Sequence, residues 1–136
     1  MSHKLNKVEK EKCIDFLFLY GDVIENHYGS YDWDNKLLVQ FCKQNNITRK
    51  GNVNSSGFDY FWFEAKKGNH NINDIAHHFL RHIRNAIAHS NFFKVSNNGK
   101  QYYELKDYNL KRRQTMYGII QVDLFWQMLN HVTNSR

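Results

Sequence analysis

The sequence predicts a mainly α protein: a helical bundle in one domain, residues 1–136, with a β-hairpin inserted before the C-terminal helix. Its 136 residues are the size of a single domain. The chain contains no proline, so its helices have no strong internal breaker. Apolar residues make up 41% of the chain and aromatic residues 15%, which is enough to build a packed core and excludes wholesale disorder.

Two helices are expected in the N-terminal third of the chain. The first extends from about Leu5 to Tyr28 and meets a stop signal at Gly29, and the second covers Asn35 to Asn45. In the first helix the apolar residues approximate one stripe: Leu5, Val8, Ile14, Leu17, Phe18, Ile24 and Tyr28. In the second helix the residues expected to face the core are Leu37, Leu38, Phe41 and Cys42.

The middle of the chain combines a loop, an ambiguous segment and the clearest helix. Residues 48–57 are polar, with two glycines and two serines, and predict a loop. Residues 58–67 are aromatic and fit either a helix or a strand. Asp74 to Ala88 predicts an amphipathic helix that Asn71 or Asn73 caps. Its apolar arc comprises Ile75, Ala76, Phe79, Leu80, Ile83, Ala86 and Ile87.

In the last third of the chain the spacing of the apolar residues first departs from the helical period and then returns to it. Phe92–Val95 and Gln101–Leu105 flank Asn98-Gly99, and Asn-Gly between two such runs is a strong signal of a β-hairpin. A C-terminal helix is expected next, with Thr115 as its cap. Its apolar positions are Tyr117, Ile120, Leu124, Phe125, Met128 and Val132.

Positive charge is concentrated in one part of the chain. The net charge is +6, and residues 81–113 supply an excess of that size, with eight basic groups against Glu104 and Asp107. Such a patch fits a polyanionic partner and, equally well, a solvated lysine-rich loop. The chain has no membrane-spanning apolar run and no N-terminal signal core, and its two cysteines suit free thiols. We therefore expect a cytoplasmic protein without membrane contact.

The polar face of the predicted Asp74–Ala88 helix has an unusual composition. Surface helices usually carry Glu and Lys on this face, whereas His, Arg and Asn suit phosphate chemistry at neutral pH. At helical spacing, the face and the residues beside it comprise His77, His78, Arg81, His82, Arg84, Asn85 and, if the helix persists, His89.

Three functional interpretations compete with an ordinary solvated surface. His78 and His82 could bind a metal, but the H-E-x-x-H pattern and nearby cysteines are missing, so no metal or other cofactor is expected. Arg84 and His89 could catalyse a reaction on phosphate. The third interpretation is simple binding of a polyanion, and its residues would be Arg81, Arg84, Tyr102, Tyr103, Lys111, Arg112 and Arg113.

The run Arg84-Asn85-Ala86-Ile87-Ala88-His89 resembles the R-x4-6-H motif of HEPN domains, the small helical proteins of RNA-cleaving toxin and defence systems. Residues 80–90 are similar to small stand-alone, often plasmid-borne members. The resemblance implies a HEPN-like helical bundle and a metal-independent endoribonuclease of toxin–antitoxin or phage-defence type, with Arg84, Asn85 and His89 in catalysis. The residues expected to bind RNA are Arg81, His82, Lys111, Arg112 and Arg113. The alternatives are a catalytically silent HEPN-fold protein that binds nucleic acid or a partner, and a structural dimer.

Residue chemistry supports the resemblance independently. Histidine exchanges protons near neutral pH and arginine binds phosphate oxygens, so RNA can be cut without a metal by attack of its 2′-OH. On one ideal helix, however, Arg84 and His89 would point about 140° apart. Either the helix ends before His89 or a second copy completes the site, and we expect a homodimer. Members with a nucleotidyltransferase antitoxin carry tyrosine where this chain has Asn91, so any antitoxin is of unknown type.

Overall fold

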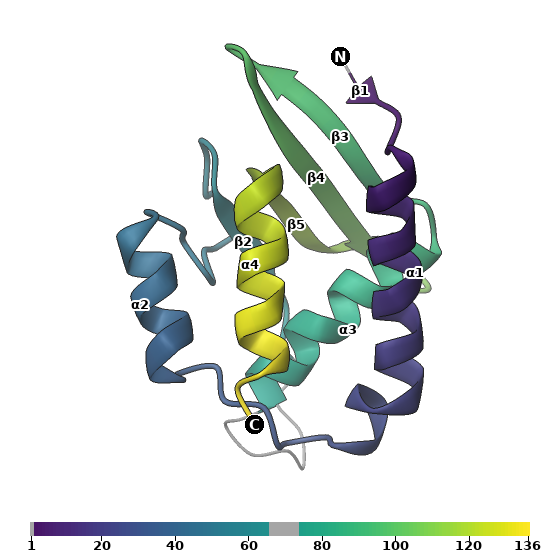
Figure 1. The fold of residues 1–136 in the computed structure, drawn as a ribbon, viewed down its shortest axis with the longest axis vertical. Coiled ribbons are helices and arrows are strands. Elements are labelled where there is room, and N and C mark those ends of the chain that lie inside the picture. Colours follow the sequence, from purple (N-terminus) through teal and green to yellow (C-terminus); the bar gives the residue numbers. More distant parts are fainter. Residues whose placement is uncertain (1, 66–73) are drawn as a thin grey trace.

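A computed structural model describes residues 2–65 and 74–136, and in these ranges four α helices pack with a five-stranded antiparallel sheet (Figure 1). The prediction of a mainly α bundle is therefore wrong. The predicted caps Asn71 and Asn73 lie outside the described residues. The helices are α1 (Lys7–Asp22), α2 (Lys36–Gln44), α3 (Asp74–Ala88) and α4 (Val122–Thr133), with a 3-10 turn η1 at Ile24–Asn26. The strands are β1 (Ser2–His3), β2 (Tyr60–Phe63), β3 (Phe92–Asn97), β4 (Lys100–Tyr108) and β5 (Gln114–Gln121).

Hydrophobic periodicity did not identify two of the strands. The ambiguous segment 58–67 contributes β2, and the first half of the expected C-terminal helix is β5, so this helix begins at Val122 rather than near Thr115. The apolar residues Tyr117, Ile120 and Leu124 imitate a helical stripe because they span the junction between β5 and α4. Pairing between β2 and β5, which lie far apart in the sequence, determines the local structure here.

The hairpin signalled by Asn98-Gly99 is present and is longer than expected. β3 and β4 pair from Phe92↔Leu105 to Asn97↔Lys100, and Asn98 and Gly99 have φ angles of 51° and 79°. Both central turn residues therefore have the positive φ of a type I′ turn, which matches the twist of the strands. The hairpin is not an insertion into a bundle, since the sheet order β1-β3-β4-β5-β2 places it at the sheet's centre.

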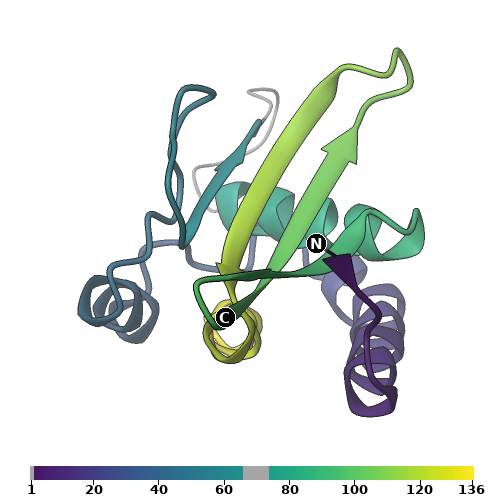
Figure 2. The ribbon, with the colours of Figure 1, turned by 90° about the horizontal axis from the view of Figure 1, so that it is seen from above.

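Alternation along the strands gives the sheet one covered face and one open face. The helices cover the first face, and α3 passes behind β4 and β5 in Figure 2. On the second face, side chains such as Tyr60, Trp62 and Tyr117 are only partly buried. The core residues that the strands contribute to the covered face are Phe61, Phe63, Phe92, Tyr103, Leu105, Met116 and Ile120.

The first helix is shorter than predicted and is rotated relative to its apolar stripe. It ends at Asp22, and Val8, Ile14 and Phe18 are 58%, 51% and 66% exposed. Glu9 explains the rotation, since its carboxylate caps the helix start, binds Lys94 Nζ at 2.9 Å and accepts a hydrogen bond from Tyr103. The side chains of α1 that are buried with it are Cys13, Phe16 and Tyr20.

Both cysteines are buried free thiols, and burial raises the pKa of each to about 11. They are protonated at neutral pH and pack as small apolar side chains. No helix in the described ranges is long and apolar enough to cross a membrane.

Candidate functional site

The C-terminal end of α3 presents His89 at the surface. Helical hydrogen bonding closes with His89 N donating to Asn85 O at 2.9 Å, and the chain then turns at Ser90, whose φ is 59°. The amide of Asn91 donates to Ala86 O at 2.8 Å, which completes a Schellman motif. The helix therefore ends at Ala88, and the imidazole of His89 is exposed beyond the regular helix.

Three histidines on the polar face of α3 are buried rather than solvated. His77, His78 and His82 are 3%, 2% and 6% exposed, whereas Arg84 and His89 are exposed. The interpretation of the face as an ordinary solvated surface is therefore wrong for these three histidines. Burying polar groups is costly unless they are hydrogen-bonded, so their partners define the site.

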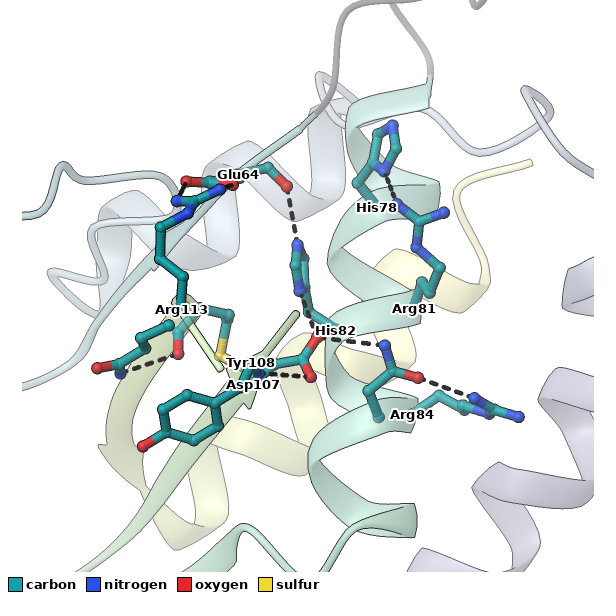
Figure 3. Close-up of polar contacts among 11 residues, drawn as sticks. Glu64, His78, Arg81, His82, Arg84, Asp107, Tyr108 and Arg113 are labelled. Carbon is teal, nitrogen blue, oxygen red and sulfur yellow. Dashed lines mark hydrogen bonds and ion pairs between the residues drawn. The ribbon is translucent and has the colours of Figure 1, made fainter. Parts of the chain in front are cut away.

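His82 contacts two acceptors, the carboxylate of Asp107 on β4 and the backbone oxygen of Glu64, the residue that follows β2. The Nδ1 of His82 lies 2.7 Å from Asp107 Oδ2, and its Nε2 lies 2.8 Å from the backbone oxygen of Glu64 (Figure 3). A carboxylate and a carbonyl can only accept, so the imidazole is the hydrogen-bond donor to either group. Burial alone would raise the pKa of the Asp107 carboxyl, but hydrogen bonds from His82 and Asn85 outweigh burial and lower it.

Asn85 connects this buried pair to the exposed Arg84. Its Nδ2 donates to Asp107 Oδ2 at 3.2 Å, so its Oδ1 is left to accept from Arg84 Nη1 at 2.8 Å. The Arg84 guanidinium also lies over the ring of Tyr20 on α1, 5.8 Å from its centroid. Two contacts, one within α3 and one from α1, thus restrict the orientation of this arginine, and Figure 3 shows the first of them.

His78 and Arg81 form a second pair one turn earlier on α3. Arg81 Nη2 donates to His78 Nδ1 at 2.6 Å, and the Tyr28 hydroxyl lies 3.3 Å from His78 Nε2. Both nitrogens of His78 and of His82 have protein partners, so neither ring directs a vacant nitrogen toward a metal. Within residues 2–65 and 74–136, no group of three or more His, Cys, Asp or Glu is arranged to hold a metal ion.

A pocket of about 210 Å³ opens between α3 and the end of β4. It brings together Arg81, His82 and Asn85 of the predicted site but does not include Arg84 or His89. The remaining lining residues are Glu64, Asp107, Tyr108, Asn109 and Thr115.

Sequence reasoning missed Glu64, Tyr28 and Asp107, because each is at least 18 residues from its histidine partner on α3. The only sequence signal is that Asp107 is one of two acids in the basic window 81–113.

The three consecutive basic residues that were predicted to bind RNA, Lys111, Arg112 and Arg113, have different surroundings in the structure. Lys111 and Arg112 are exposed in the turn that Asn109 organises, where Asn109 Oδ1 accepts from the amides of residues 111 and 113. Arg113 instead makes a two-point ion pair with the Glu64 carboxylate. Lys94 from the same basic window is buried against Glu9, so the exposed positive charge is smaller than the sequence count indicates.

Comparison with known proteins gives one family. The family model described as HEPN pEK499 p136 matches residues 16–135, which include all four α helices except the start of α1. Searches of curated proteins and of solved structures gave no significant match.

Proposed function

Because the chain belongs to the HEPN pEK499 p136 family, we propose that it is a metal-independent endoribonuclease of toxin–antitoxin or phage-defence type. The observation that carries this proposal is that the motif residues at the end of α3 are exposed and that one of them is held in a fixed orientation. Arg84 is exposed and oriented by Asn85, and His89 is exposed where the helix ends. Cleavage through the 2′-OH requires a cation held in place and an accessible imidazole, and the motif presents one group of each kind at the surface.

In the proposed reaction, the 2′-oxygen of RNA attacks the adjacent phosphorus and the bond from phosphorus to the 5′-oxygen breaks. One imidazole accepts the 2′-OH proton, and a second donates a proton to the leaving 5′-oxygen. Arg84 binds the nonbridging oxygens, whose negative charge grows in the transition state. The products are a 2′,3′-cyclic phosphate and a 5′-hydroxyl end.

Two proton transfers need two histidines, and we propose that a homodimer supplies one His89 from each copy. The pocket on α3 contains neither Arg84 nor His89, so in a single chain these side chains face outward. Exposed Ile14 and Phe18 on α1, the helix whose Tyr20 contacts Arg84, offer an apolar surface for the second copy.

The roles of the other predicted residues follow from their exposure. Lys111 and Arg112 are free to approach phosphates, and Arg81 borders the pocket. His82 is buried, so we assign it to positioning Arg84 through Asp107 and Asn85 rather than to direct RNA contact.

The test is cleavage of a single-stranded RNA by purified protein and by His89→Ala. Removing a general acid–base group should lower the cleavage rate by ~10²–10⁴-fold, and EDTA should leave the wild-type rate unchanged. His3→Ala, which removes an exposed histidine on the edge strand β1, is the matched control. Wild-type cleavage by His89→Ala would overturn the assignment, and the absence of cleavage by the wild type would favour the silent nucleic-acid-binding protein.

A further inference from the structure

The open face of the sheet carries aromatic side chains that the proposed cleavage reaction does not use. Trp62 of β2 stands opposite Tyr117 of β5, and both are partly exposed. The ring of Tyr60 lies 5.8 Å from that of Tyr117, at an interplanar angle of 42°. Farther along the same face, Phe58 is 42% exposed and Phe93 is 37% exposed. An antiparallel sheet normally presents polar side chains on the face that helices leave open, so this composition indicates a ligand.

The aromatic residues of β2 and β5 enclose a pocket. It has a volume of about 360 Å³, and its walls include the rings of Tyr60, Trp62 and Tyr117. Polar groups of Asn52, Gln114 and Arg113 border the same space. Apolar walls with a few convergent amide and guanidinium groups suit a flat, polar-edged ring such as a nucleobase.

Charge around this pocket favours a polyanion over an apolar partner. The unpaired positive charge comes from Lys111 and Arg112, which are exposed in the turn that leads into β5, whereas Arg113 lines the pocket with its guanidinium paired to a carboxylate. The carboxylate that pairs with Arg113 belongs to Glu64, which also lines the pocket beside His82 and Asn85. The two pockets are therefore neighbours on either side of one ion pair, and one extended chain could reach both.

We propose that the pocket of Tyr60, Trp62 and Tyr117 binds an unpaired base of single-stranded RNA. The inference builds on the proposed ribonuclease function and defines its substrate class, since bases inside a duplex have no free faces to stack on these rings. The aromatic rings stack the base, the amides of Asn52 and Gln114 meet its edge, and the basic turn binds the backbone.

The test measures binding separately from cleavage, in a His89→Ala background and with a labelled, unstructured RNA 12-mer. Trp62→Ala and Tyr117→Ala should each raise Kd roughly 5- to 100-fold while leaving the slope of log Kd against log salt unchanged. Lys111→Ala/Arg112→Ala should instead flatten that slope by up to about 1.4, about 0.7 for each lost contact with single-stranded phosphate. Leu37→Ala, at an exposed apolar residue on α2, should change neither value.

A fluorescence measurement covers the case in which Trp62→Ala does not fold. RNA should quench tryptophan emission in the parent protein, and Trp62→Phe should lose most of this quenching while keeping an affinity within a few-fold of the parent. A duplex of the same sequence should bind equally to the parent and to Tyr117→Ala.

Unchanged Kd in folded Trp62→Ala and Tyr117→Ala would overturn the inference, and so would an equal loss of duplex affinity. A change of oligomeric state with RNA affinity retained would assign this face to contact between protein copies instead. If the wild type cleaves RNA and the aromatic variants bind normally, only this inference fails. If the wild type binds through the aromatic pocket but cleaves nothing, only the ribonuclease proposal fails.

Discussion

Asp107 is the residue on which the polar contacts of the site converge. Its Oδ2 accepts from both His82 and Asn85, and its Oδ1 accepts from the amide of Tyr108. The carboxylate therefore fixes which way the Asn85 amide faces, and this in turn leaves Asn85 Oδ1 for Arg84. A buried negative charge thus stabilises the fold and orients an exposed positive charge.

Asp107→Asn should lower the free energy of unfolding by about 1.5–3 kcal/mol at neutral pH, the usual contribution of a hydrogen bond to a charged group. Urea denaturation measures this loss, and Asp15→Asn, at an exposed carboxylate on α1, is the matched control. The variant should also slow RNA cleavage, because Asn85 is no longer held in one orientation. Normal cleavage by Asp107→Asn would contradict the positioning role of this carboxylate.

The difference in stability between wild type and Asp107→Asn should depend on pH. The folded-state pKa of Asp107 lies below its ordinary value of 3.8, because hydrogen bonds from His82 and Asn85 outweigh burial. The stabilisation is thus complete above that ordinary value and is lost as the pH falls through the lowered folded-state pKa. Urea titrations at decreasing pH should show the two proteins converging only below about pH 4.

At the scale of elements, local signals predicted some parts of the structure and tertiary pairing determined others. Periodicity identified α3 with its bounds, and Asn98-Gly99 identified the β3–β4 turn, because a single helix face or a two-residue turn contains the whole signal. β2 and β5 depend on each other across more than 50 residues, and the rotation of α1 depends on the contact of Glu9 with Lys94. One sequence contains no local signal that shows which distant segments or residues will contact each other.

The close packing between β2 and β5 predicts that a side chain at Gly118 would destabilise the protein. A Cβ at this position would lie 2.4 Å from the Phe61 ring, so Gly118→Ala should destabilise the protein by about 1–3 kcal/mol through overpacking. Gly21→Ala is the matched control, because nothing lies within 4 Å of a Cβ there and alanine is the better helix former. Thermal unfolding should show a lower Tm for the first variant and an equal or higher Tm for the second.

At the scale of the whole molecule, the sequence located the motif but not the contacts behind it. Arg84 and His89 were identified by their resemblance to the R-x4-6-H motif, and both are at the surface. Glu64 and Asp107 come from other elements and lie next to α3 only after the sheet has formed. A single chain also leaves Arg84 and His89 outside the pocket on α3, and the homodimer proposed above would supply the second His89 that the reaction needs.

The apolar side chains exposed on α1 allow a direct test of the proposed dimer face. Phe18→Glu should shift the protein from dimer to monomer in sedimentation and should abolish cleavage, because a charge in an apolar interface is left unpaired. Leu37→Glu introduces the same charge at an equally exposed residue of α2 and should change neither property. A monomer of Phe18→Glu that still cleaves RNA would contradict the requirement for a dimer.

Mixing subunits tests whether the active site itself is shared. Arg84→Ala/His89→Ala is titrated into wild type, and exchange between the two is verified by mass spectrometry. If each site needs both copies, every mixed dimer is inactive, and equal proportions retain about one quarter of the wild-type activity because random pairing leaves about one quarter of the dimers intact. If each chain cleaves RNA alone, activity falls in proportion to the wild-type fraction and about half is retained under the same random pairing. A linear titration with complete exchange would therefore exclude the shared site, even for a protein that is a dimer in solution.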